Sequence, residues 1–502
     1  MLRKIKRVAA TVLFWALLAA TFVHLTYLYR GDLAHTRKHV TGFYDEKQDS
    51  LDVIMIGTSA TFSAFMPMEA WNQYGMVSYN FSINTLYTDS IKYYVREALK
   101  TQSPKLLIID IAPFLFGHHS FGKMEEVFEV PTRYNTDGLS LSKNRFDLIN
   151  AIVPEWEDRL EFYFDLFYYH GDTIPQPVFA GNRQHNVEKG YDNLPIRQIY
   201  TNDELAERNR TEIELDEANK EAFLDLLEEL QDYDFPVLFI SQPYLNVENG
   251  SPDGLAAYME RVIGEYGFAF LNLTDHAEEI GIDDIFDYSL DYLHYNTSSA
   301  EKITAYLGKY VMEHYPIPDR RGEEAYRSWH EDYVLWQEIL EEERQETKRQ
   351  MLEMFEQTTE PECYLNLLRS DYVSSCIWIS SQPFVYKDEI LWGRISDLGV
   401  ALQSEGVPHN SLVIIDHTLN RQILYNEGAE FRFSSTFGEV RYTDGDMPEL
   451  YIQESDHSDL LENGTLIAVV VAERETGKLI DFITWGSNED DYVILSHKTY
   501  YP

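Results

Sequence analysis

The chain has 502 residues and a formal net charge of −43. A chain of this length exceeds what one ordinary hydrophobic core organises, so we expect two folded parts. The charge excludes a protein that binds the phosphate backbone of nucleic acid, because such contacts need Lys and Arg to displace counterions. We therefore expect no nucleic-acid partner and interpret the acidity as a solubilising surface.

The N-terminus combines a basic cluster with a long apolar run. Four Lys and Arg residues lie between Arg3 and Arg7, and the apolar stretch 8–29 follows them. This stretch is long enough to span a bilayer and exceeds the apolar region of a cleaved signal peptide. Because basic residues stay on the cytoplasmic side, we expect residues 1–30 to be a cytoplasmic N-terminus and a single transmembrane anchor in the cell membrane, with the rest outside.

Short apolar segments alternate with amphipathic ones from about 52 to 315, which is typical of an α/β protein with a mainly parallel sheet. We predict strands at 52–57, 77–83, 105–111, 235–241 and 268–273, and helices at 88–101 and 216–233. The aromatic-rich segment 114–210 is interpreted as an insertion that either shapes a substrate cleft or packs on the core. We therefore expect a three-layer α/β domain over residues 31–318.

A charged helix is predicted after the two prolines of "YPIPDRRG". It covers about 323–357, within an expected helical linker of 319–360. Its apolar stripe fades among charged residues, so a sustained coiled coil is not expected. The stripe comprises Trp329, Tyr333, Trp336 and Leu340. We expect it to pack against one of the chain's own domains while the helix acts as a spacer.

The last part of the chain, 361–502, has β character. We predict strands at 373–381, 411–417, 421–426, 430–435, 449–455 and within 466–485, where Glu475-Thr476-Gly477 forms a hairpin turn. The region contains no residues at metal-ligand spacing and no nucleophile with an obvious base. We expect a β-rich accessory domain that binds carbohydrate or a partner. Cys363 and Cys376 either form a disulfide or are two small core residues.

A serine follows the first predicted strand directly, in "DVIMIGTSATF". Ser59 would lie at a helix N-terminus, where backbone N–H groups converge and the helix dipole is positive. An acyl-transfer oxyanion is stabilised in such a place. Taken alone, Gly57-Thr58-Ser59 fits equally well an ordinary turn in which Ser59 caps the helix.

A second motif supplies a base and an acid. "DYLHYN" places Asp291 and His294 three residues apart on a loop before the last helix of the α/β region. A serine nucleophile needs a His to accept its proton and a carboxylate to orient that His. A parallel sheet gathers such loops at the carboxyl ends of its strands, where Ser59 also emerges. Asp287 is a competing carboxylate, but the spacing favours Asp291, which predicts the triad Ser59, His294 and Asp291.

With these residues the sequence resembles the SGNH (GDSL-like) hydrolases, within them the membrane-anchored cell-envelope branch with DltD of teichoic-acid D-alanylation and the alginate O-acetylation proteins. The resemblance covers about 52–311. "IGTSAT" is its first block and "DYLHYNTSSAEKIT" its last, which carries Ser59 over to the nucleophile, Asp291 to the acid and His294 to the base. "YNFSIN" looks like the second block, and "PKLLIIDI" like the strand before the third. The implied fold is a three-layer SGNH/flavodoxin-like parallel sheet.

The sequence departs from the family pattern around the oxyanion. Thr58 stands where the family usually has Asp, Ser82 replaces the glycine of the second block, and Ala112 or Pro113 occupies the place of the third-block Asn. A lost donor costs on the order of 3 kcal/mol of transition-state stabilisation, which favours a slow or specialised transferase over a broad esterase. The remaining candidate donors are the backbone N–H groups of Ala60 and Ser82 and the side chains of Asn80 and Asn84.

The resemblance implies an extracytoplasmic acyl esterase or O-acyltransferase that acts on cell-envelope polysaccharide through an acyl-Ser59 intermediate. His294 would act as general base and then general acid, with Asp291 orienting it. A multi-spanning membrane acyltransferase is the implied partner, and no cofactor or metal is expected. The missing donors leave a second interpretation open: a catalytically degenerate scaffold that binds glycan or assembles an envelope biosynthesis or export complex.

Overall fold

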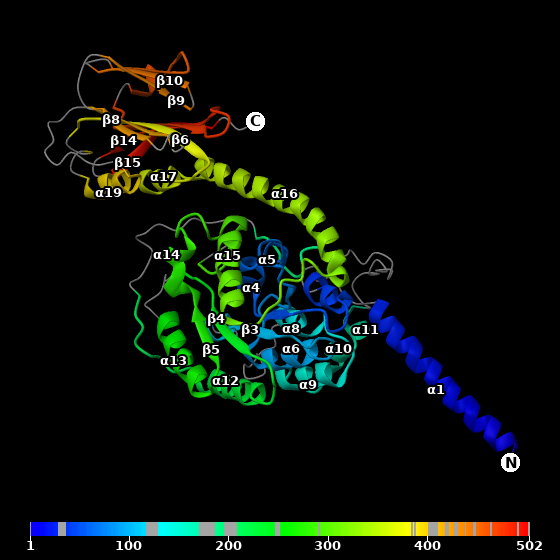
Figure 1. Cartoon of the computed structure of the whole chain (residues 1–502). Coiled ribbons are helices and arrows are strands. Elements are labelled where there is room, and N and C mark those ends of the chain that lie inside the picture. Colours follow the sequence, from blue (N-terminus) through cyan, green and yellow to red (C-terminus); the bar gives the residue numbers. More distant parts are fainter. Residues whose placement is uncertain are drawn as a thin grey trace. The chain divides into compact units, whose positions relative to one another are not determined.

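The chain is described from a computed structural model and forms two compact units, Met1–Arg344 and Gln345–Pro502 (Figure 1). The described residues are 2–28, 37–116, 129–169, 186–194, 208–245, 251–289, 292–382, 385, 388–399, 410–416, 421–425, 430–436, 438–444, 448–461, 464–488 and 491–499. Asp291 therefore lies outside the described residues.

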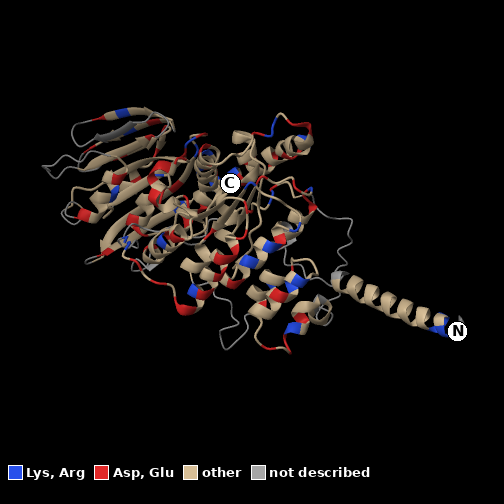
Figure 2. Ribbon diagram, turned by 60° about the horizontal axis from the view of Figure 1, so that its bottom comes forward, with Lys and Arg blue, Asp and Glu red and all other residues tan. Residues whose placement is uncertain are grey.

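The first element, helix α1 (Leu2–Leu28), is long and apolar enough to cross a membrane. Its apolar stretch Arg3–Thr26 has 24 residues, which at the helical rise gives about 36 Å. In Figure 2 the charged residues of this helix gather at its N-terminal end. At its other end Phe22 packs on Phe164 and Phe167, with ring centroids 4.9 and 5.7 Å away.

The first unit is built on a five-stranded parallel sheet. Its strands are β1 (Val53–Ile56), β2 (Ser78–Asn80), β3 (Leu106–Asp110), β4 (Val237–Ser241) and β5 (Ala269–Asn272). They lie in the order β2-β1-β3-β4-β5, and every neighbouring pair is parallel. All five predicted strands are confirmed. The chain reverses its direction of winding between β1 and β3, which makes their carboxyl ends the switch point where ligands bind in such sheets.

Helices cover the sheet on two sides, so the α/β class is confirmed. Figure 1 shows α4, α5 and α15 on one side of the strands and α6, α9 and α12 on the other. The helices of this unit are α3 (Gly42–Asp45), α4 (Ser59–Ala64), α5 (Pro67–Tyr74), α6 (Ile91–Ala98), α7 (Ala112–Leu115), α8 (Glu129–Thr136), α9 (Lys143–Ile152), α10 (Arg159–Tyr163), α11 (Asp165–Tyr169), α12 (Glu217–Leu230), α13 (Ser251–Glu265), α14 (Ala277–Ile280) and α15 (Thr297–His314). A π-helical turn, η1 (Arg37–Thr41), and 3₁₀ turns at Thr88–Ser90, Leu273–His276 and Glu324–Tyr326 complete it.

The predicted charged helix is α16 (Arg327–Gln357), and the boundary between the two compact units falls inside it, after Arg344. Its apolar stripe packs on the α/β core as expected. Trp329, Trp336 and Leu340 are buried there. The Trp336 Nε1–H donates a hydrogen bond of 3.0 Å to Glu69, so the stripe also provides a partner for a buried carboxylate.

Trp336→Phe is expected to destabilise the first unit by about 1–3 kcal/mol, because it leaves the Glu69 carboxylate, 7% exposed, without the indole donor. Thermal unfolding monitored by circular dichroism measures the effect as a lower melting temperature of the first unit. The matched control is Trp156→Phe, since Trp156 is 73% exposed. Equal melting curves for the two variants would contradict this role of Trp336.

The second unit contains antiparallel sheets, which confirms the predicted β-rich region. A six-stranded sheet has the order β15-β14-β13-β6-β7-β8, and a four-stranded one has the order β12-β11-β10-β9. The elements are α17 (Pro361–Leu367), β6 (Val373–Ile379), α19 (Glu389–Asp397), β7 (Ser411–Asp416), β8 (Arg421–Tyr425), β9 (Phe431–Ser435), β10 (Gly438–Thr443), β11 (Glu449–Ile452), β12 (Ser455–Asp456), the 3₁₀ turn Ser458–Leu461, β13 (Ile467–Glu473), β14 (Leu479–Asn488) and β15 (Asp491–Thr499). The predicted hairpin turn between β13 and β14 is confirmed.

The two cysteines, both among the described residues, are not joined by a disulfide. Cys376 is buried in β6, where burial raises the pKa of its thiol to about 12. The disulfide that the sequence left open is therefore not formed, and of the two cysteines Cys376 is a small core residue whereas Cys363 is half-buried.

Candidate functional site

The turn after β1 presents Ser59 as the first residue of α4. The helix cap is its neighbour: the Thr58 hydroxyl accepts from the Ala60 N–H at 3.3 Å, and the Thr61 hydroxyl accepts from the Thr58 N–H at 3.1 Å. The interpretation of Ser59 as the capping residue is therefore wrong. Because Thr58 takes the cap, the Ser59 hydroxyl remains available for another partner.

That partner is His294. The Ser59 Oγ lies 2.7 Å from the His294 Nε2, although the two residues are 235 positions apart. Both side chains are half-buried, so they remain accessible from solvent. When the proton is on the other ring nitrogen, Nε2 accepts the Ser59 O–H, which is the arrangement a general base needs.

The loop that carries His294 is held at both ends. Before it, the Ser289 N–H donates to the His294 carbonyl at 2.9 Å, and Tyr288 pairs with Tyr295 across the loop in an antiparallel bridge. After it, the Asn296 side chain caps α15 by accepting from the backbone N–H groups of the next turn. The bridge to Tyr295 and the cap at Asn296 hold the backbone directly after His294, which helps to keep the imidazole in place.

The acid of the predicted triad, Asp291, lies outside the described residues. The competing carboxylate Asp287 is buried and lies 2.7 Å from the Lys302 Nζ, and it accepts a hydrogen bond from the Asp283 N–H at 2.7 Å. Burial raises the pKa of Asp287, while Lys302 opposes the shift. Among the described contacts, the Asp287 carboxylate therefore pairs with Lys302 and accepts from the backbone of its own loop, and it makes none with His294.

The four predicted oxyanion donors differ in whether their N–H groups already have an acceptor within the fold. The Ala60 N–H is used within the helix cap, and the Asn80 side-chain amide donates to the Phe65 carbonyl at 2.6 Å. Ser82 is buried, and no acceptor within the described part of the chain meets its backbone N–H. The Ser59 N–H, at the first position of α4, is likewise without an acceptor among the described residues. Ser82 and Ser59 therefore retain backbone donors at this edge of the sheet.

Asn84, the fourth candidate, lies in the turn after β2 and is half-buried. The next residue, Thr85, has a φ of 51°, in the left-handed region that a β-branched residue rarely adopts. Its carbonyl accepts from the Asn135 Nδ2 at 2.9 Å, so the insertion helps to hold this strained turn. Nothing in the sequence marks Thr85, because such a conformation is usually signalled by glycine.

A carboxylate that the sequence did not single out lies beside the nucleophile turn. Asp110 ends β3, is fully buried, and accepts from the Thr61 hydroxyl at 2.8 Å and the Ala112 N–H at 2.9 Å. Burial raises its pKa to about 6 against these hydrogen bonds. Its only signal in the sequence is a single acid at the end of the apolar run "KLLIID".

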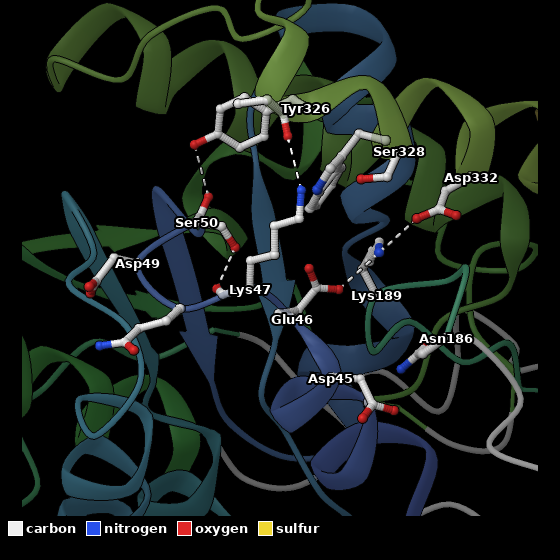
Figure 3. Close-up of a pocket in the computed structure, with 14 residues that line it drawn as sticks. Asp45, Glu46, Lys47, Asp49, Ser50, Asn186, Lys189, Tyr326, Ser328 and Asp332 are labelled. Carbon is white, nitrogen blue, oxygen red and sulfur yellow. Dashed lines mark hydrogen bonds and ion pairs between the residues drawn. The ribbon is translucent and has the colours of Figure 1, made fainter. Parts of the chain in front are cut away.

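A separate cavity of about 410 Å³ lies between segment 45–50, which precedes β1, and the start of α16 (Figure 3). Its buried Lys189 lies 2.9 Å from Glu46 and 2.8 Å from Asp332. Burial opposes the charge of Lys189, but the two carboxylates raise its pKa. The lining carries the carboxylates of Asp45, Glu46, Asp49 and Asp332 against the lysines Lys47 and Lys189, so acidic groups outnumber basic ones; it does not include Ser59.

These features define an α/β protein with a hydrogen-bonded Ser–His pair at the switch point of a parallel sheet. Within the described residues, His, Cys, Asp and Glu side chains do not gather in groups of three or more that could hold a metal ion. A scan against protein-family models finds no match for the chain, and a search of curated proteins finds none either. These two comparisons therefore assign the chain to no family.

Proposed function

We propose that the protein is a membrane-anchored, SGNH-type acyl esterase or O-acyltransferase that modifies cell-envelope polysaccharide through an acyl-Ser59 intermediate. The observation that supports this most is the 2.7 Å distance between the Ser59 Oγ and the His294 Nε2. Hydrogen-bond reach between nucleophile and base is the geometric requirement for a serine acyl-transfer enzyme. The resemblance of the two sequence blocks supplies the substrate class.

In the first half-reaction His294 takes the Ser59 proton while the Oγ attacks the carbonyl carbon of the acyl donor. The tetrahedral oxyanion is stabilised by backbone N–H groups, for which Ser59 and Ser82 are the candidates. The intermediate collapses by breaking the bond to the leaving alcohol, which receives the proton from His294. Acyl-Ser59 and a free alcohol result.

In the second half-reaction the acceptor, a sugar hydroxyl or water, loses its proton to His294 and attacks the acyl-Ser59 carbonyl. Collapse of the second tetrahedral intermediate returns the proton to the Ser59 Oγ. Asp291 is the proposed carboxylate that orients His294. Transfer and hydrolysis differ only in the acceptor.

A serine-directed fluorophosphonate tests the proposal directly. Wild-type protein is expected to gain one phosphonyl group, and mass spectrometry of its peptides is expected to place that group on Ser59, because the pair with His294 makes this hydroxyl nucleophilic. Protein denatured before exposure to the probe is the control for non-specific labelling. Absence of an adduct, or labelling equal to that of the denatured control, would contradict the enzymatic proposal.

A second candidate, a degenerate scaffold that binds glycan or assembles an envelope complex, is favoured by one observation. The Ala60 N–H and the Asn80 amide are both engaged within the fold, which reduces the set of oxyanion donors. Genetic complementation separates the two candidates. A scaffold retains full complementation with Ser59→Ala, and an enzyme loses it although the variant folds.

We further propose that α1 crosses the cell membrane once, with its basic end in the cytoplasm. Protease added to intact spheroplasts is expected to digest the α/β unit, whereas a tag fused before Arg3 stays protected until the cells are lysed. A variant with Arg3, Lys4, Lys6 and Arg7 all changed to Glu is expected to lose this fixed orientation. Protection of the α/β unit in intact spheroplasts would contradict the proposed topology.

A further inference from the structure

The nucleophile turn is tied to the neighbouring strand by a chain of buried hydrogen bonds. The Thr58 N–H donates to the Thr61 Oγ1 at 3.1 Å, and the Thr61 hydroxyl donates to the Asp110 Oδ2 at 2.8 Å. The second carboxylate oxygen, Oδ1, accepts from the Ala112 N–H at 2.9 Å. A single carboxylate at the end of β3 thus connects the start of α7 with the turn that carries Ser59.

Close packing leaves this turn little room to move. A Cβ added to Gly57 would lie 1.9 Å from the Thr61 Oγ1 and 2.9 Å from the Asp110 Cβ. The Asp110 side chain therefore lies directly against the backbone just before Ser59. Position 57 therefore has no room for a side chain, and the backbone of the turn packs directly on Thr61 and Asp110.

We propose that Asp110 is a positioning residue for the acyl-transfer reaction: through Thr61 it sets the backbone of the 57–59 turn so that the Ser59 Oγ meets His294. This inference depends on the proposed function for its catalytic consequence, and on the hydrogen bonds alone for its structural part. Asp110 touches neither Ser59 nor His294 in the described contacts. Its effect is therefore expected in the reactivity of Ser59.

The ionisation of Asp110 gives the proposal a distinctive signature. Burial raises its pKa to about 6, and the hydrogen bonds from the Ala112 N–H and the Thr61 hydroxyl oppose that shift; charged groups are not among the causes. A raised carboxyl pKa means that the fold loses stability as the pH rises from about 4 to about 6. Asp110→Asn removes this loss, so at pH 8 its melting temperature is expected to equal or exceed that of wild type.

The reactivity of Ser59 is expected to fall in the variants, although the melting temperature of Asp110→Asn does not. At pH 8, Asp110→Asn and Thr61→Val are each expected to slow fluorophosphonate labelling of Ser59 by about 10- to 100-fold, as displacement of a reacting group typically does. The double variant is expected to be no slower than either single variant, because both changes break the same chain of bonds. Thr61→Ser keeps the hydroxyl and is expected to restore most of the rate.

The chain offers a matched control pair in its other compact unit. The Thr499 hydroxyl donates to the buried carboxylate of Asp481 at 2.7 Å, which is the same type of contact. Thr499→Val and Asp481→Asn are expected to leave the labelling rate unchanged. A wild-type rate in Thr61→Val and Asp110→Asn, or rate losses that multiply in the double variant, would overturn the positioning role.

Hydrogen–deuterium exchange separates this inference from the proposed function. The amides of residues 57–61 are expected to exchange faster in Asp110→Asn than in wild type, whether or not Ser59 reacts with the probe. If wild-type protein does not react with the probe but the amides of 57–61 still exchange faster in Asp110→Asn, the proposed enzymatic function is refuted and the structural role of Asp110 stands. Unchanged exchange at 57–61 would refute the role of Asp110 itself.

Discussion

Ser59→Ala is expected to lower fluorophosphonate labelling and acyl turnover by at least about 10³-fold, with an unchanged melting temperature. Loss of the hydroxyl removes the atom that forms the acyl intermediate, and what catalysis remains comes from the oxyanion donors and binding alone. The fold is expected to survive, because Thr58 and not Ser59 caps α4. Labelling is measured by intact mass over time.

Ser298→Ala is the matched control for this variant. Ser298 is also half-buried and lies in the first turn of α15, four residues after His294. It lacks the contact with the imidazole that Ser59 makes, so its replacement is expected to leave the labelling rate within about twofold of wild type, as for substitutions outside a site. Equal losses in the two variants would show that Ser59 is not the nucleophile.

His294→Gln is expected to slow labelling by about 10²- to 10⁴-fold, the usual contribution of a general base. Glutamine retains a polar side chain but has no nitrogen that takes the Ser59 proton near neutral pH. The double variant with Ser59→Ala is expected to be no slower than Ser59→Ala alone, because the two side chains act as a unit. Single-turnover release of a p-nitrophenyl acyl ester measures the same effect on the chemical step.

His314→Gln is the matched control, on the helix α15 that follows His294. His314 ends α15 and its Nδ1 lies 2.8 Å from the Tyr310 carbonyl on the exposed surface. Its replacement is expected to change neither labelling nor ester turnover. If His294→Gln retains the wild-type rate while Ser59→Ala does not, a different group is the base and the proposed pair is refuted.

The strands of the parallel sheet were predictable because buried segments are marked in the sequence by short runs of apolar residues. Four of the five parallel strands are fully buried and the edge strand β5 is buried at its second half, and the short apolar runs between polar turns predicted all five. The strands that sequence reasoning missed, β10 and β15, have a different character. β15 is a sheet edge with a largely half-buried or exposed pattern, so it lacks the continuous apolar run that marks a buried strand.

The candidate site was only partly predictable, for a related reason. Ser59 and His294 were identified because each lies in a recognisable local motif, and their contact followed from the general rule that parallel strands bring loops to one edge. Asp110 carried no such motif, since one acid at a strand end is common. The role of Asp110 depends on its hydrogen bond with Thr61, 49 positions away, and this contact exists only because β3 lies next to β1.

By itself, the sequence determined the apolar first helix, the α/β pattern of the first part and the β character of the last. These are properties of burial along short segments, and periodicity records them directly. The tertiary structure alone decided that Thr58 rather than Ser59 caps α4, that Asp287 pairs with Lys302, and that Asp110 holds the turn. The contact of Thr61 with Asp110 depends on the position of β3 next to β1, which local patterns do not encode. The cap and the Asp287–Lys302 pair depend on side-chain geometry that residue types alone leave open.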